Sequence, residues 1–249
     1  MKDYGRLERS VFEKALEDLK ENGFMFLIVK TGRFFKHKFQ KRFANSIVDK
    51  LKKKPVEFFY FDDKKFPYFL HPYNLTWDNE RIVEIPILLE YLKKVSFDKV
   101  LEVGAVLPHY ADVKWDVLDK FEPGEGILNQ DIVDFKPKKR YDLIMSISTL
   151  EHVGYDDEYN PEKIVKAINH LKSLLSYKGK FIATMPLGYN KYMDSLVFSN
   201  KIGAKKMFFL KRVNSGNKWK EVGLESIRDI RYNSPHNNAN GIVVCFFEK

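Results

Sequence analysis

The chain has 249 residues, of which 44% are apolar and 15% aromatic, so its length and composition suit one α/β domain with an extension or two small domains. No stretch approaches the roughly 18 apolar residues of a membrane-spanning helix, and the N-terminal sequence lacks the apolar segment of a secretory signal. A single cysteine, Cys245, excludes an intramolecular disulfide and a zinc site built from several cysteines. Together these features predict a cytoplasmic protein.

Positive charge is concentrated near the N-terminus. Residues 1–65 hold 17 Lys or Arg against 10 Asp or Glu, a net +7, so only +2 of the total +9 remains for the rest of the chain. Such an excess is typical of a solvated face, but also of a surface that approaches the phosphates of RNA or of an anionic lipid. Charge alone does not decide between these interpretations.

The first part of the chain predicts an extension with mixed structure. Apolar spacing predicts a helix over residues 1–22, and 24–29 and 57–61 are typical of strands. Between them, residues 33–54 mix aromatic and basic side chains and suit one amphipathic helix. We therefore divide the chain into a basic, aromatic N-terminal extension or lid, residues 1–70, and a main domain, residues 71–249.

The main domain opens with a helix predicted over residues 73–94, for which Thr76 is the candidate N-cap. A second helix is predicted to start at Pro161, with Gly179 just after its end. Apolar strands are expected at 99–104, 115–119, 141–148 and 180–187. Strands that alternate with crossovers predict a doubly wound, mostly parallel α/β sheet. The last two strands, 205–213 and 241–249, have no predicted helix between them and suit an antiparallel pair that closes one edge.

A turn at Gly104 follows the first of these strands, where an open α/β sheet binds its ligand. A dinucleotide places its pyrophosphate over this turn and needs several glycines in the pattern G-x-G-x-x-G. Here Val106 stands at the second glycine position, so nicotinamide and flavin dinucleotides are disfavoured. An adenosyl ligand without phosphates needs fewer bare amides, but it does need an acid for its ribose and a polar group for its adenine.

Carboxylates at the ends of the next strands meet that need. Asp119 closes the second strand and can accept hydrogen bonds from both ribose hydroxyls, whereas Asp131 can accept one from the adenine amino group, with Ile132 against the ring. Glu102, inside the first strand, can either orient the Gly104 turn or receive an ammonium group of the ligand.

Five segments in this order resemble the class I S-adenosylmethionine-dependent methyltransferases. They are VLEVG, the LD pair at Leu118 and Asp119, DIVDF, YDLIMSISTLEHVG and LLSYKGKFIATMPL, and the resemblance covers residues 76–190. It implies a seven-stranded, Rossmann-like methyltransferase fold and S-adenosyl-L-methionine as the cofactor. It also implies cofactor contacts at Ala105 and Ser148, beside those expected for Glu102, Gly104, Asp119, Asp131 and Ile132.

Methyl transfer from a sulfonium needs alignment of the acceptor and, for an alcohol, a base that removes the proton. His152, just after the fourth strand of the main domain, is the candidate base, and Glu151 is an alternative base or a cofactor contact. Asp156 and Asp157 could help His152 to bind a divalent metal, but their spacing is loose and no metal site is predicted. The Asn/Asp-Pro-Pro-Tyr-like motif of amino methyltransferases is missing from the segment that holds His152. The cytosine-C5 class needs a cysteine nucleophile, and Cys245 lies within the last strand instead.

These observations favour O-methylation of a small molecule or of a sugar hydroxyl in a glycan. The alternative is an RNA methyltransferase whose basic N-terminal region follows the nucleic-acid backbone while its aromatic residues stack on bases. A third interpretation, prompted by the altered loop after Gly104, is a non-catalytic protein of the same fold.

Overall fold

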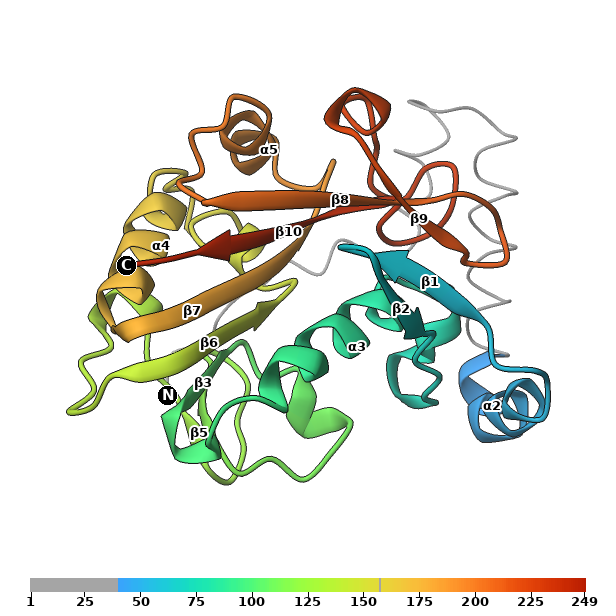
Figure 1. Cartoon of the computed structure of the whole chain (residues 1–249), viewed down its shortest axis with the longest axis horizontal. Coiled ribbons are helices and arrows are strands. Elements are labelled where there is room, and N and C mark those ends of the chain that lie inside the picture. Colours follow the sequence, from blue (N-terminus) through green and yellow to red (C-terminus); the bar gives the residue numbers. More distant parts are fainter. Residues whose placement is uncertain (1–39, 157) are drawn as a thin grey trace, which may run out of the picture.

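The computed structural model describes residues 40–156 and 158–249 (Figure 1). The helix predicted over residues 1–22, the strand at 24–29 and the start of the 33–54 segment lie outside these residues. From the rest of that segment comes α2 (Ala44–Lys52). Nowhere in the described ranges is there a helix with the length and apolar character needed to cross a membrane.

One large sheet organises the described part of the chain. Its strands are β3 (Val100–Val103), β4 (Asp116–Leu118), β5 (Ile127–Leu128), β6 (Tyr141–Ile147), β7 (Leu175–Pro186), β8 (Lys206–Arg212), β9 (Trp219–Val222) and β10 (Gly241–Phe247). They lie in the order β5-β4-β3-β6-β7-β10-β8-β9. The first five are parallel, whereas β10 is antiparallel to both β7 and β8, and β9 is antiparallel to β8. The doubly wound, mostly parallel α/β fold is confirmed, with eight strands in place of seven.

Helices cover both faces of this sheet and bury two cores. Alternate residues of β6 face opposite sides, so Ile144 belongs to one core and Leu143 and Met145 to the other. The first core lies under α4 (Lys163–Ser173) and α5 (Lys191–Phe198), and the second lies under α3 (Arg81–Leu92) (Figure 1). Burial of such strands on both faces explains their near-continuous apolar sequence.

A hairpin from the N-terminal region joins the second core. It consists of β1 (Phe58–Phe61) and β2 (Lys64–Pro67), and its buried Phe59, Phe61 and Phe66 side chains pack in the same cluster as α3. The strand predicted at 57–61 is confirmed as β1. The division of the chain near residue 70 stays a prediction, and the hairpin shows that this part of it shares a core with the main sheet.

Short 3-10 turns connect the main elements at the carboxyl edge of the sheet and elsewhere. They are η1 (Tyr73–Asp78), η2 (Phe97–Lys99), η3 (Leu107–His109), η4 (Ile132–Asp134), η5 (Leu150–His152) and η6 (Leu224–Ser226). The segment after Gly104 therefore contains only the single turn η3 where a doubly wound fold usually has a full helix. Its brevity fits the short spacing between β3 and β4.

Two predicted helices have different limits in the structure. The 73–94 segment forms η1 and then α3, because the Thr76 hydroxyl does not cap a helix: it donates to the Phe69 carbonyl at 2.9 Å and accepts from the His71 amide at 2.8 Å. The second helix ends at Ser173, so Gly179 lies within β7. A Cβ at Gly179 would lie 2.7 Å from the Tyr141 carbonyl oxygen, so close backbone packing explains this glycine.

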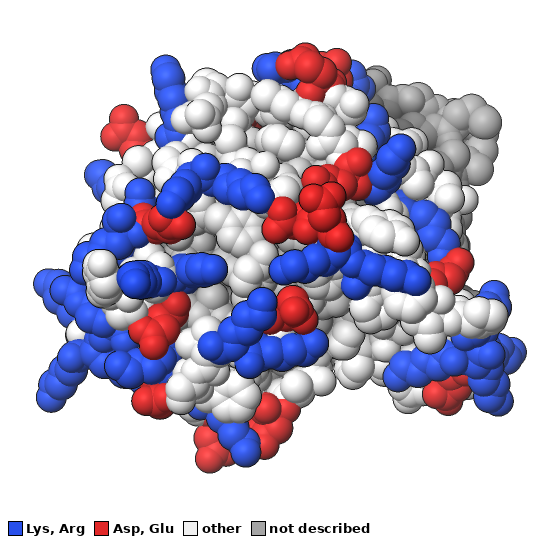
Figure 2. All heavy atoms as spheres, in the orientation of Figure 1, with Lys and Arg blue, Asp and Glu red and all other residues white. Residues whose placement is uncertain are grey.

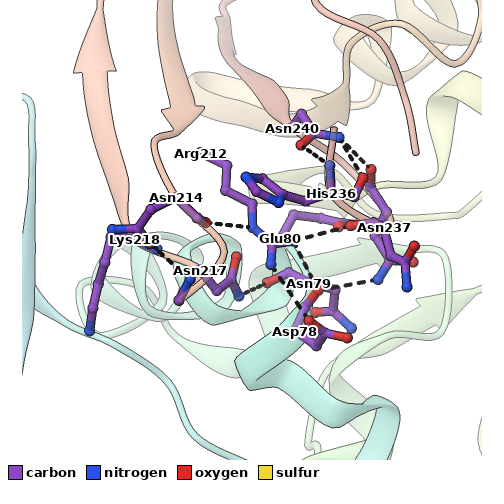
Figure 3. A network of polar contacts seen from close by, with 12 residues as sticks. Asp78, Asn79, Glu80, Arg212, Asn214, Asn217, Lys218, His236, Asn237 and Asn240 are labelled. Carbon is purple, nitrogen blue, oxygen red and sulfur yellow. Dashed lines mark hydrogen bonds and ion pairs between the residues drawn. The ribbon is translucent and has the colours of Figure 1, made fainter. Parts of the chain in front are cut away.

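A buried polar network ties the start of α3 to the antiparallel end of the sheet (Figure 3). Arg212, at the end of β8, donates to the carbonyls of Asp78 and Asn237 at 3.1 Å each and lies 3.5 Å from the Asp78 carboxylate. Asn217 donates to the Asn79 carbonyl at 2.8 Å, and the Ala239 amide donates to the Glu80 carboxylate at 3.1 Å. These bonds hold Glu80 and the first turn of α3 in a fixed position at the carboxyl edge of the sheet.

Candidate functional site

The Gly104 turn requires glycine for two reasons. Its φ of +88° lies in the left-handed region, which other residues adopt at a cost. A Cβ there would lie 2.0 Å from the hydroxyl oxygen of Thr149, which follows β6. The backbone of β3 therefore approaches the β6 loop more closely than any side chain at position 104 allows.

The backbone amides that follow Gly104 donate hydrogen bonds to carboxylates of the protein. The amides of Val106 and Leu107 donate to one oxygen of Glu102 at 3.0 and 2.6 Å, and the Ala105 amide donates to Asp119 at 3.0 Å. A phosphate-binding loop points such amides at its ligand. Here they are already bonded to anionic groups, so this turn is unsuited to a pyrophosphate.

Glu102 fixes the conformation of the turn. Its carboxylate is fully buried and also accepts from the Trp115 indole at 2.9 Å. Burial raises the pKa of Glu102 to about 7, although the three N–H donors and the Arg81 charge oppose the rise. The contacts match the first expectation for Glu102, orientation of the turn.

Asp119 lies at the expected place, directly after β4. Its second oxygen accepts from the amides of Phe121 and Glu122 at 2.8 Å each, so the backbone fixes the orientation of the carboxylate. The side chain is only partly buried and lines the pocket beside Gly104. Each carboxylate oxygen has lone pairs beyond those bonds, so Asp119 can accept hydroxyl donors from that pocket.

Asp131 begins η4 and is paired with two lysines. Lys163 Nζ, at the start of α4, lies 2.8 Å from its carboxylate, and Lys120 Nζ lies 3.2 Å away. Burial opposes ionisation, but the bonds to Lys163, to the Val133 amide and to Lys120 outweigh it and keep the pKa of Asp131 below its usual range. The sequence analysis missed Lys163, because only the fold places the start of α4 beside η4.

One pocket collects most of the predicted cofactor residues. It is lined by Gly104, Asp119, Asp131, Ile132 and His152, together with residues that the sequence analysis did not single out: Thr149, Val153, Gly154, Lys120 and Lys163. Ala105 contributes its backbone to the turn and is itself buried. Glu102, Ser148 and Glu151 lie beside the pocket without lining it.

His152 forms a pair with Asp156 at the mouth of this pocket. Its Nδ1 lies 2.5 Å from the Asp156 carboxylate, which also accepts from the Tyr189 hydroxyl at 2.9 Å. A carboxylate accepts, so Nδ1 donates to Asp156, and in the neutral imidazole Nε2 then has the lone pair. The imidazole is half exposed and packs edge-on against the Tyr189 ring at 5.0 Å. The arrangement suits a general base.

Ser148 and Glu151 face a second, buried polar cluster. The Ser148 hydroxyl donates to Glu84 at 2.6 Å, and Glu84 also pairs with Arg81 in the first turn of α3. Glu151 is 1% exposed, and one of its carboxylate oxygens lies 3.6 Å from His152 Nε2. Burial raises the pKa of Glu151 well above its usual range, with the Glu84 charge adding to the rise.

No metal site is evident in the residues that the structure describes, since no three His, Cys, Asp or Glu side chains gather closely enough to hold an ion. Asp157, weighed with Asp156 as a metal ligand, lies outside the described residues.

The sequence matches no protein-family model and no curated protein. Among similar solved structures, the N-methyltransferase NodS from Bradyrhizobium japonicum WM9 with S-adenosyl-L-homocysteine has 14% identity over 68% of this chain and 86% of NodS, with a TM-score of 0.44. A possible histamine N-methyltransferase from Thermotoga maritima has 12% identity over 68% and 91%, with a TM-score of 0.41. At these values the likenesses carry no argument about this chain, and the strand order and the site geometry carry the functional argument.

Replacement of Gly104 by Ala should destabilise the protein by about 3 kcal/mol, since a φ cost of about 1 kcal/mol adds to the overlap with Thr149. Gly203 is a matched control, because it has a φ of +80° and an added Cβ would meet no described atom within 4 Å. Gly203→Ala should show the φ cost alone. Urea unfolding measures both, and equal losses would contradict the close approach at Gly104.

The stability of the protein should depend on pH through Glu102. The pKa is about 7 in the folded state against an ordinary value of 4.5, so the folded state binds this proton more tightly. The stabilisation is complete below pH 4.5 and is lost as the pH rises through 7. Relative to Glu102→Gln, the wild type should lose on the order of 2–3 kcal/mol of unfolding free energy between pH 4 and pH 8. Urea unfolding at both values tests this, and a constant difference would contradict it.

Proposed function

We propose that the protein is an S-adenosylmethionine-dependent methyltransferase that transfers a methyl group to a hydroxyl of a small molecule or of a sugar in a glycan. The observation that carries the proposal is the Gly104 turn, whose amides are bonded to Glu102 and Asp119 and whose pocket also holds Asp131 and Ile132. This donor and acceptor set suits an adenosine without phosphates.

The residues present fit that cofactor. The Gly104 turn borders the pocket, Asp119 offers acceptors for ribose hydroxyls, and Asp131 and Ile132 would hold the adenine. Arg81, partly buried at the start of α3, lies close enough to influence the charge on Glu102, and its guanidinium pairs with Glu84. When bound, the cofactor supplies an electrophilic methyl group on a sulfonium, which needs no further activation by the protein.

His152 and Asp156 supply the base chemistry for an alcohol acceptor. Asp156 holds Nδ1–H of His152, and the Tyr189 hydroxyl fixes Asp156 in turn. His152 Nε2 would accept the hydroxyl proton as the acceptor oxygen forms its new bond to carbon. Because the imidazole is half exposed, the proton can then pass to water. The protein contributes alignment through Tyr189, which packs against His152, and through Tyr155 and Tyr232, which both pack against Tyr189.

A second candidate is methylation of RNA. Figure 2 shows basic and acidic side chains interspersed over much of the visible face, with basic ones gathered over α2. In this helix only Val48 is buried, and Lys50 and Lys52 lie in its last turn. Such a surface also suits an anionic lipid. If the protein is retained on RNA at low salt and released as the salt concentration rises, the result would favour nucleic acid over a neutral acceptor.

Incubation with tritiated S-adenosylmethionine and a panel of alcohols, sugars and glycans tests the proposal. Label should enter a hydroxyl-bearing acceptor, and His152→Ala should lower kcat by about 100-fold or more. Asp156→Asn should lower kcat with little change in KM, because Asp156 acts through His152. His170→Gln, on α4 and away from the pocket, is the control.

Label found only in RNA would overturn the hydroxyl assignment. Binding of S-adenosylhomocysteine without transfer to any acceptor would identify a non-catalytic protein of this fold. Full activity of His152→Ala would remove His152 as the base.

A further inference from the structure

Three glutamates are buried around one guanidinium at the start of α3. Glu80, Glu84 and Glu151 are 7%, 0% and 1% exposed. Glu84 forms an ion pair with Arg81, and the Arg81 charge opposes the rise that burial causes in the pKa of Glu80 and of Glu151. Arg212 is a buried arginine nearby, but its donors are directed to the Asp78, Asn214 and Asn237 carbonyls and to the Asp78 carboxylate (Figure 3). Among the described residues, carboxyl groups therefore outnumber the cations available to them in this part of the structure.

The three glutamates differ in what they bind. Glu84 is bonded to Ser148 and Arg81, and Glu80 accepts from the Ala239 amide. One oxygen of Glu151, Oε2, is fully buried and has no hydrogen-bond partner among the described residues. A buried polar atom without a partner is costly in a folded protein and calls for an explanation. Glu151 is thus, within the described ranges, an unpartnered acceptor beside Glu84, Arg81 and Glu80.

Charge and burial favour protons on two of these groups when no cation is near. Burial, the largest cause, raises the pKa of Glu80, and the Glu84 charge adds to the rise. The pKa of Glu151 is raised in the same way, with Arg81 opposing. A cation placed between them would replace those protons and satisfy the unpartnered oxygen.

Two tyrosines lie near the same charged groups. Tyr232 lies close enough to Glu80, Glu151 and Arg81 to respond to all three charges, and its ring packs against Tyr189 at 5.1 Å. Tyr110 lies near Arg81 and Glu84. Carboxylates together with electron-rich ring faces are the groups that recognise an ammonium ion.

We propose that the acceptor carries a protonated amine, which binds between Glu151 and the Glu80–Glu84 pair while its hydroxyl faces His152. This inference rests on the proposed function. The other oxygen of Glu151 lies 3.6 Å from His152 Nε2, so the amine and the reacting hydroxyl belong to nearby carbons of one acceptor. The substrate class is an amino alcohol, such as an amino sugar with a free amine.

Matched acceptors test the inference. With wild-type enzyme, kcat/KM for free amino sugars such as glucosamine should exceed that for glucose and N-acetylglucosamine by about 30-fold or more, since the last two lack the charge. Glu151→Gln should reduce this preference to less than about threefold. Glu90→Gln, on the exposed side of α3, should retain it. Binding of S-adenosylhomocysteine to each variant confirms that the site is folded.

Calorimetry distinguishes the acceptor from the cofactor as the source of the ammonium. In buffers of different ionisation enthalpy, glucosamine should release a proton when it binds the S-adenosylhomocysteine complex. Proton release on binding of S-adenosylhomocysteine, but not of methylthioadenosine, would assign the carboxylates to the cofactor's own amine and overturn the inference.

The kinetic outcomes separate the two proposals. Equal or better transfer to neutral acceptors would overturn the amine inference and leave the methyltransferase proposal standing. Methyl found on the nitrogen would also overturn it, because that nitrogen would then face the sulfonium. Transfer to no acceptor would overturn the proposed function, and this inference with it.

Discussion

The site depends on one buried carboxylate, Glu102, and on the amides that converge on it. In β3, a fully buried glutamate would be unfavourable without partners, and the Val106 and Leu107 amides with the Trp115 indole supply them. The same hydrogen bonds fix the conformation of the chain after Gly104, which therefore does not need the further glycines of a phosphate-binding loop. Asp119 binds the remaining Ala105 amide. The amides that would bind phosphate are thereby used inside the protein, and Asp119 and Asp131 present acceptors to the pocket that they border.

Charge is arranged differently at the two ends of this site. Lys163 and Lys120 balance the carboxylates of Asp131 and Asp119 in the same pocket, so that end of the pocket is close to neutral. Around Glu84 and Glu151, Arg81 faces several carboxyl groups. Both patterns follow from the sheet topology, which brings the start of α4 to one side of β3 and the start of α3 to the other. The neutral end suits an adenine ring, and the acidic end suits a cationic acceptor.

The sequence was most informative where local pattern and fold agree. The apolar strands β3, β4, β6 and β7, the antiparallel pair β8 and β10, and the positions of Gly104 and Asp119 at strand ends were predictable, because strand burial and chain order determine them. The short strand β9 and the helix α5 were not, because their patterns are brief. Asn190 shows the missed signal for α5: its side chain accepts from the Tyr192 and Met193 amides as an N-cap.

Long-range polar contacts were beyond the sequence. Nothing local indicates that Ser148 meets Glu84, 64 positions away, or that Lys163 meets Asp131, because tertiary packing alone brings these pairs together. Thr76 is a case where the local pattern was misleading. Its sequence context suited a helix cap, but its hydroxyl is hydrogen-bonded to the backbone of Phe69 and His71 instead. The roles of His152 and Glu151 stay predictions, to which the structure adds their partners.

The central claim is that the Gly104 turn holds an adenosine without phosphates, and calorimetric titration with S-adenosylhomocysteine and with adenosine diphosphate tests it most directly. We predict saturable binding of the thioether with a dissociation constant in the micromolar range, about −8 kcal/mol, and no detectable binding of the diphosphate. Binding of the diphosphate as tight as that of the thioether would contradict it.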